Sequence, residues 1–236
     1  MIDASALRAR LAGVRDRIAR AARRAGRDPS SITLVAVSKT FPAEHVRAAA
    51  AAGQIDFGEN KVQEALQKIA QTSDLSIRWH LVGHLQSNKA KKTTGFDVIH
   101  SIDGADLLAK VDEAAHAAGR RIDLLVQVDL AGEATKHGAG ADELAPIFEA
   151  ARVARSTRVV GLMLLPPAVD DANLARPYFQ QLRALRDRLV AQGVDRSMMS
   201  ELSMGMSHDF EVAVEEGSTM VRVGTAIFGA RTGVRP

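Results

Sequence analysis

The chain has 236 residues, of which 46% are hydrophobic and 25% charged, with a net charge of +3, seven histidines and no cysteine. The absence of cysteine excludes disulfides, thiolate catalysis and zinc–thiolate sites. The basic excess is small and aromatic residues make up only 4%, so we expect no nucleic-acid-binding surface. No stretch approaches the roughly 20 apolar residues of a membrane span, and arginines interrupt the N-terminal segment where a secretory signal needs an apolar run. We therefore expect a cytoplasmic protein that does not associate with membranes.

Short apolar runs alternate with amphipathic segments along the chain. A helix is predicted over residues 3–25, and further helices over 43–52, 61–71, 105–118 and 174–192. Eight strand-like runs are predicted at 33–38, 55–58, 78–83, 98–101, 124–129, 159–164, 201–204 and 220–223. Several of these runs are apolar on consecutive residues, which is typical of strands covered on both faces in a parallel sheet.

The alternation of eight strands with helices, in a chain close to the roughly 250 residues of one such fold, favours a (β/α)8 TIM barrel. We expect residues 1–236 to form this single barrel, with the first helix as an addition to it. An open doubly wound sheet is the alternative, but no G-x-G-x-x-G follows the first strand, which counts against dinucleotide binding.

Functional groups of such barrels gather at the carboxyl ends of the strands. Lys39 directly follows the first apolar run. Apolar surroundings favour an uncharged amine that can attack an aldehyde, although the same position also suits a lysine whose head group reaches solvent.

Two turns near the end of the chain complement this lysine. Arg222 lies inside an apolar run and, once buried, needs an acceptor. Gly224 and Thr225 follow that run and leave backbone N–H groups open to an anion. A second turn of small residues, 203–207, offers further N–H and hydroxyl groups. Each turn alone is an ordinary cap, but together with Lys39 they describe a site for a phosphorylated aldehyde.

The sequence resembles the pyridoxal phosphate homeostasis proteins, which have an alanine racemase N-terminal-domain-like fold. The matching segments are AVSKT (36–40), FGEN (57–60), WHLVGHLQSNK (79–89), GEATKHG (132–138), LSMGMS (202–207) and GSTMVRVGTAIFG (217–229). Their order and spacing match over nearly the whole chain.

The resemblance implies that pyridoxal 5′-phosphate (PLP) is the cofactor and that Lys39 forms a Schiff base with it. It also implies that Arg222 faces the pyridine nitrogen and that Asn60 lies beside the cofactor ring, with His80 nearby. The phosphate-holding residues that it implies are Ser203, the backbone of Met204, Gly224 and Thr225.

Three functions remain open at this point. The first is a PLP carrier that buffers the cofactor in vitamin B6 homeostasis and delivers it to apo-enzymes, without strong catalysis. An arginine at the pyridine nitrogen opposes protonation and makes the ring a poorer electron sink. The second function is a weak amino-acid racemase. The racemases use a tyrosine from a separate domain as second base, whereas Tyr178, the single tyrosine here, lies in a predicted outer helix. His80, Lys136 or water would have to replace that tyrosine. The third is an unrelated barrel lyase or phosphosugar enzyme that uses Lys39.

No residue is assigned a catalytic role, and Lys136 is either a transfer amine, a phosphate contact or a solvated loop lysine. The histidines show no metal-ligand spacing such as H-E-x-x-H, so no metal is predicted.

Overall fold

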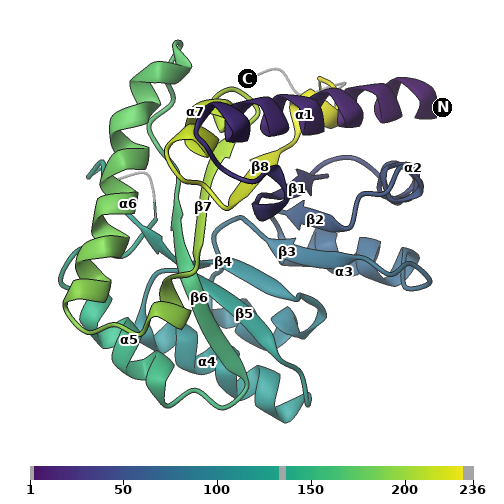
Figure 1. Cartoon of the computed structure of the whole chain (residues 1–236). Coiled ribbons are helices and arrows are strands. Elements are labelled where there is room, and N and C mark those ends of the chain that lie inside the picture. The colour runs from purple at the N-terminus through teal and green to yellow at the C-terminus, as the bar shows by residue number, and fades with distance from the viewer. Residues whose placement is uncertain (1–2, 133–136, 231–236) are drawn as a thin grey trace.

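The computed structural model describes residues 3–132 and 137–230. Eight parallel strands close into a barrel in which each strand pairs with the next and β8 pairs with β1 (Figure 1). The strands are β1 (Thr33–Val37), β2 (Asp56–Glu59), β3 (Arg78–Leu81), β4 (Val98–Ile102), β5 (Ile122–Val128), β6 (Thr157–Leu164), β7 (Glu201–Met206) and β8 (Met220–Val223). The barrel prediction is confirmed, and each strand lies where its apolar run predicts it, with ends shifted by at most two residues.

Helices surround the barrel on its outside. They are α1 (Ala4–Arg24), α2 (Ala43–Ala51), α3 (Val62–Gln71), α4 (Ala105–Ala117), α5 (Leu144–Arg152), α6 (Arg176–Ala191), α7 (Phe210–Glu215) and α8 (Thr225–Phe228), with 3-10 turns η1 (Pro29–Ser31), η2 (Ser87–Gly95), η3 (Ala172–Ala175) and η4 (Arg196–Met199). The helix predicted at 174–192 was placed too early, because its first residues belong to η3. Pro177 has no N–H to donate, so it suits the first turn of α6.

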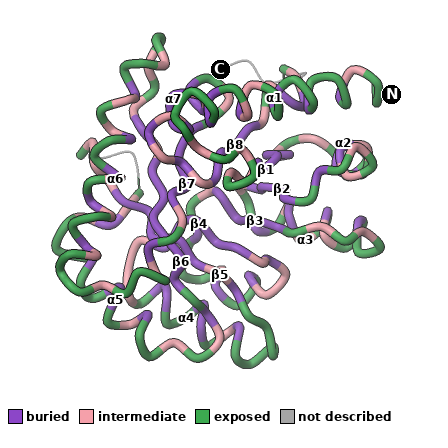
Figure 2. The backbone as a smooth tube through the Cα atoms, in the orientation of Figure 1, coloured by how far each residue is buried: buried purple, intermediate pink, exposed green. Residues whose placement is uncertain are grey.

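Alternate residues of the strands enter two separate apolar layers. In β1, Leu34 and Ala36 belong to the large cluster between strands and helices, whereas Val35 and Val37 pack with Val82 in a small cluster. Because successive strand side chains point to opposite faces, the small cluster lies inside the barrel. Figure 2 shows that the strands are mostly buried, whereas most exposed residues lie in the helices and loops. The exposed strand residues are Arg78, Arg158 and Met206, each at or near a strand end.

The predicted extra helix is α1, which runs beside α7 and α8 (Figure 1). Its buried residues Leu7, Leu11, Val14 and Ile18 recur at the three- and four-residue spacing of one helix face. Next to this buried face, the guanidinium of Arg17 donates two hydrogen bonds to the carboxylate of Glu211 in α7, at 3.1 and 2.8 Å. In the described ranges, no helix has the length and apolar character needed to cross a bilayer.

Asp112 of α4 connects this helix to the start of β6. Its carboxylate accepts hydrogen bonds from the backbone N–H groups of Arg155, Ser156 and Thr157, at 2.8 to 3.1 Å. We expect Asp112→Ala to lower the free energy of unfolding by about 3 kcal/mol, because three backbone donors lose their acceptor and the buried N–H of Thr157 is left without a partner, which alone costs about 1–3 kcal/mol. Chemical denaturation measures this loss, and Glu113→Ala, an exposed neighbour on α4, should change stability by less than about 0.5 kcal/mol.

The same carboxylate predicts an acid-dependent loss. Burial opposes ionisation of Asp112, but the hydrogen bonds from residues 155–157 outweigh it and lower the pKa of the carboxyl below 3.8. A depressed pKa stabilises the fold above the unfolded-state value and loses that contribution as the pH falls through the folded-state value. The difference in stability between the wild type and Asp112→Ala should therefore shrink below about pH 4. A difference that stays constant from pH 7 to pH 3 would contradict this assignment.

Candidate functional site

The carboxyl ends of β1 and β8 lie side by side, because these two strands close the barrel. Ala36 pairs with Val223. A Cβ on Gly224 would lie 3.2 Å from the carbonyl oxygen of Val37, so the turn after β8 touches the last residue of β1. Lys39 lies only two residues further along the chain. The turn that carries Lys39 and the turn that carries Gly224 and Thr225 are therefore neighbours.

The turn that carries Lys39 is fixed on both sides of the half-buried lysine. Ser38 Oγ donates a 2.6 Å hydrogen bond to Glu59 Oε1 at the end of β2. The N–H of Thr40 donates to Glu64 Oε1 of α3, also at 2.6 Å. Thr40 has a φ of +69°, a left-handed conformation that is uncommon for a residue other than glycine. Such backbone strain persists only where the surroundings hold it in place.

Lys68 of α3 links these anchors. Its Nζ donates to the carbonyl of Ser38 (2.8 Å), to Glu59 Oε1 (2.7 Å) and to Glu64 Oε1 (2.9 Å). Both Lys68 and Glu59 are buried, with exposed fractions of 5% and 0%. Burial raises the pKa of Glu59, and the hydrogen bonds from Lys68 and Ser38 oppose that rise. The segment around Lys39 thus rests on a buried cation shared by two carboxylates.

Three other predicted site residues lie at or near strand ends. Asn60 is half-buried and directly follows β2, whereas Thr225 is exposed and begins α8. The side chain of Met204 is fully buried in the large apolar cluster, so only its backbone can face a ligand. Its carbonyl accepts a 2.8 Å hydrogen bond from Ser218 Oγ.

The turn after β8 directs two backbone N–H groups at one side-chain oxygen. Ser207 Oγ accepts from Gly224 N at 3.1 Å and from Ala226 N at 3.5 Å. A hydroxyl oxygen among backbone donors marks where an oxygen of an anion can be held. The turn expected at 203–207 is wrong for its first four residues, which continue β7 to Met206. Ser203 was the expected phosphate contact, and Ser207 was only part of the same segment. The signal that separates the two serines is their place on β7: Ser203 lies within the strand, whereas Ser207 follows its end.

A chain of hydrogen bonds crosses the barrel interior from Arg222 to Asp56. Arg222 Nη1 donates to Ser203 Oγ at 2.5 Å, and this oxygen lies 2.8 Å from His100 Nδ1. His100 Nε2 lies 2.9 Å from His80 Nδ1, and His80 Nε2 lies 2.9 Å from Asp56 Oδ1. His80, predicted near the cofactor ring, therefore has both ring nitrogens engaged inside the barrel.

Arg222 is buried and has hydrogen-bond acceptors, as its position in an apolar run predicts. Besides Ser203, its guanidinium donates through Nη2 to the carbonyl of Leu164 at 2.8 Å. Burial lowers the pKa of Arg222 to about 10, and the nearby carboxyl of Asp209 acts in the opposite direction. With this pKa the side chain carries a positive charge at neutral pH.

The hydrogens along the chain can all point one way. Burial, followed by the neighbouring His80 and Arg222, holds the pKa of His100 well below 6.5, so its ring is neutral. Arginine only donates hydrogen bonds, so the hydroxyl of Ser203 accepts from Arg222 and is free to donate to His100. His100 then donates to His80, and His80 donates to Asp56. This direction fixes the tautomer of each histidine ring. Asp56 borders a cavity of about 340 Å³ at the amino ends of β1 and β2, the opposite end of the barrel from Lys39.

The neutral, buried His100 predicts a pH dependence of stability. A histidine with a depressed folded-state pKa stabilises the fold above the unfolded-state pKa, near 6.5, and that contribution is lost as the pH falls below it. We expect the free energy of unfolding to fall by about 1.4 kcal/mol per pH unit from this group. In denaturation measured between pH 7 and pH 5, His100→Gln should show a shallower slope than His116→Gln, an exposed control; equal slopes would contradict a neutral His100.

Comparison with known proteins agrees with this fold. The family model described as "Alanine racemase, N-terminal domain" matches residues 3–232, which defines the class of barrel. At 14% identity and a TM-score of 0.73, the structure of alanine racemase from Clostridium difficile 630 shares the fold, with 97% of this chain covering 58% of that one.

Closer relatives define the family within that class. The chain belongs to the pyridoxal phosphate homeostasis proteins, being 43% identical to the one from Aquifex aeolicus (94% of this chain, 97% of the relative) and 40% identical to the one from Escherichia coli K12 (94% and 95%). The structure of PipY from Synechococcus elongatus PCC7942 with PLP bound is 39% identical and has a TM-score of 0.83, covering 94% of this chain and 100% of that one.

Proposed function

We propose that this protein binds PLP as a Schiff base on Lys39 and acts as a carrier and buffer of the cofactor in vitamin B6 homeostasis. The observation that carries the proposal is the contact between the turn after β8 and the end of β1, which brings backbone donors close to the segment with the strand-end lysine. The PLP-bound structure of PipY, a relative of 39% identity over 94% of the chain, supports the choice of cofactor.

The donor set fits a phosphorylated aldehyde. Backbone N–H groups of Gly224 and Ala226, with the hydroxyl of Ser207, suit a phosphate, and Thr225 and the backbone of Met204 are proposed to complete its surroundings. The amine of Lys39 suits the aldehyde. Ser203, proposed from the resemblance as a phosphate contact, is better placed to orient Arg222, because its hydroxyl already accepts from that guanidinium.

The remaining roles follow from charge and position. Asn60, which follows β2, is proposed to lie beside the cofactor ring. Bound PLP supplies an electrophilic aldehyde carbon and an electron sink. Arg222, charged at neutral pH, opposes protonation of a pyridine nitrogen that it faces, because like charges repel. A weaker electron sink suits storage of the cofactor better than abstraction of a proton from an amino acid.

The available second bases also favour a carrier over a racemase. Tyr178 belongs to α6 on the outside of the barrel, where it is half-buried against the large apolar cluster. His80 is fully buried and both of its ring nitrogens are engaged. Lys136 lies outside the described residues.

The experiment compares cofactor transfer with turnover. Purified protein loaded with PLP is mixed with an apo PLP-dependent enzyme, and recovery of that enzyme's activity is followed together with loss of the Schiff-base absorbance. In parallel, the same protein is incubated with L- and D-alanine, and enantiomer composition is measured over time.

We expect transfer of cofactor and no saturable racemisation. Racemisation that saturates with substrate and disappears in Lys39→Ala would replace the carrier by an enzyme. If the protein shows no PLP absorbance after loading but converts a carbonyl substrate, an unrelated barrel enzyme is favoured. Both results would overturn the proposal.

A further inference from the structure

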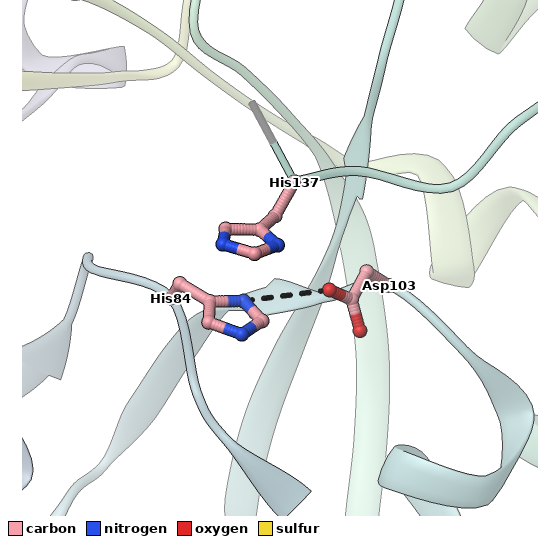
Figure 3. A group of neighbouring side chains, drawn as sticks. All are labelled: His84, Asp103 and His137. Atoms are coloured by element: carbon pink, nitrogen blue, oxygen red, sulfur yellow. Dashed lines mark ion pairs between the residues drawn. The ribbon is translucent and has the colours of Figure 1, made fainter. Parts of the chain in front are cut away.

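Two histidines and an aspartate meet at the carboxyl end of the barrel, outside the site described above (Figure 3). His84 follows β3, Asp103 follows β4 and His137 follows β5, so three neighbouring strands each contribute one side chain. One ligand-type atom from each residue lies within 4.8 Å of the other two. The three residues are far apart in sequence, which is why the spacing of the histidines predicted no metal.

Direct contacts within this group are poor hydrogen bonds. His84 Nδ1 lies 3.5 Å from Asp103 Oδ2, beyond the usual 2.7–3.2 Å of an N–H···O bond. The rings of His84 and His137 are stacked, with centroids 3.5 Å apart and an interplanar angle of 11°. By contrast, an ion held tetrahedrally at about 2.0–2.1 Å separates its ligand atoms by roughly 3.3–3.4 Å. The 3.5 Å spacing of His84 and Asp103 therefore suits a shared ion better than a direct bond, and the ligand atom of His137 lies within 4.8 Å of both.

The backbone beside both histidines is firmly held. A Cβ on Gly83 would lie 2.2 Å from the backbone oxygen of Asn60, so only glycine fits just before His84. A Cβ on Gly138 would lie 2.7 Å from the backbone nitrogen that follows β5, which fixes the chain just after His137. The carbonyl of His137 also accepts a hydrogen bond from the side chain of Gln127. The site is thus built on a preorganised backbone.

The charges of the group favour a cation. A neutral imidazole offers the lone pair of a ring nitrogen to a metal. The side chains of His84 and Asp103 are only 33% and 24% exposed. A bound cation would offset the cost of holding the half-buried carboxylate of Asp103 in its charged form.

We propose that His84, Asp103 and His137 bind one divalent transition-metal ion of the zinc class, with a fourth position open to water or a small anion. Two imidazoles and one carboxylate suit Zn²⁺ or Co²⁺ better than Mg²⁺ or Ca²⁺, which prefer oxygen ligands throughout. Coordination requires the ring of His137 to tilt out of the stack, and its exposed position leaves room for that rotation. A bound ion would tie together the connections after β3, β4 and β5. The proposal does not depend on the proposed function.

The test uses the full, untagged chain after dialysis against a chelator. Co²⁺ is titrated while its visible absorption is recorded, Zn²⁺ binding is measured by calorimetry, and thermal unfolding is recorded with and without Zn²⁺. The variants are His84→Ala, Asp103→Asn and His137→Ala, and the matched control is His116→Ala, which removes an exposed histidine of α4.

We expect one equivalent of Zn²⁺ to bind the wild type and His116→Ala and to raise the unfolding temperature of both. Each of the three ligand variants should bind at least about a hundredfold more weakly, since loss of a mere supporting hydrogen bond costs about 10–100-fold. Lys39→Ala should bind as the wild type does, which separates this site from the PLP proposal. The absence of stoichiometric binding to the wild type, or binding that survives in His84→Ala and His137→Ala, would overturn the proposal.

Discussion

Lys39→Ala is expected to abolish covalent attachment of PLP while leaving the fold intact. The amine of Lys39 is the proposed partner of the aldehyde, and the segment around it is anchored through Ser38 and Thr40 and not through the lysine chain alone. The visible Schiff-base absorbance should disappear, and PLP that still binds should be removed by dialysis.

Two controls define that result. Lys91→Ala, which removes an exposed lysine of η2, should keep the absorbance of the wild type. Far-ultraviolet circular dichroism of Lys39→Ala should match the wild type, so that loss of cofactor is not loss of fold. Retention of the absorbance in Lys39→Ala would show that another amine binds the aldehyde.

Lys68→Met is expected to have the largest effect on stability, about 3–5 kcal/mol, because it leaves buried Glu59 and its neighbour Glu64 without their shared cation. Equilibrium denaturation at pH 7 measures this loss. The carbonyl of Ser38 also loses its donor, so we expect weaker PLP retention as a second consequence. Gln67→Ala, an exposed position one residue earlier on α3, should leave both properties unchanged.

A second substitution distinguishes charge imbalance from lost packing. Glu59→Gln removes the buried negative charge, and burial already raises the pKa of Glu59. The double variant Lys68→Met/Glu59→Gln should therefore be more stable than Lys68→Met alone. If the double variant is instead less stable by the sum of the two single losses, the residues do not act as a pair.

The strand pattern could be predicted from the sequence because apolar runs in a parallel barrel are continuous. The runs at 124–126 and 159–164 show this most clearly, and they became β5 and β6. The start of α6 was harder, since a 3-10 turn and an α-helix have similar sequence preferences until Pro177 fixes where the α-helix begins. The position of Lys39 in the site was also predictable, because functional residues of such barrels lie at the carboxyl ends of the strands.

The details of the site depend on contacts between distant segments and were not predictable in that way. Ser203 and Ser207 belong to one motif. Only the position at which β7 ends shows that the hydroxyl of Ser203 lies inside the barrel and that of Ser207 at its rim. Glu64 and Lys68 have the spacing of an exposed helical ion pair, yet Lys68 is buried beneath the turn of Lys39. The meeting of His84 with His137 likewise exists only once β3, β4 and β5 are adjacent.

The most direct test of the central claim is borohydride reduction of PLP-loaded wild-type protein followed by mass mapping of its peptides. Reduction fixes an imine as a stable amine, so the modified peptide identifies the lysine that held the aldehyde. We predict a single pyridoxyl-phosphate adduct on Lys39. An adduct confined to another lysine, or none at all, would contradict the account of a cofactor held between the ends of β1 and β8.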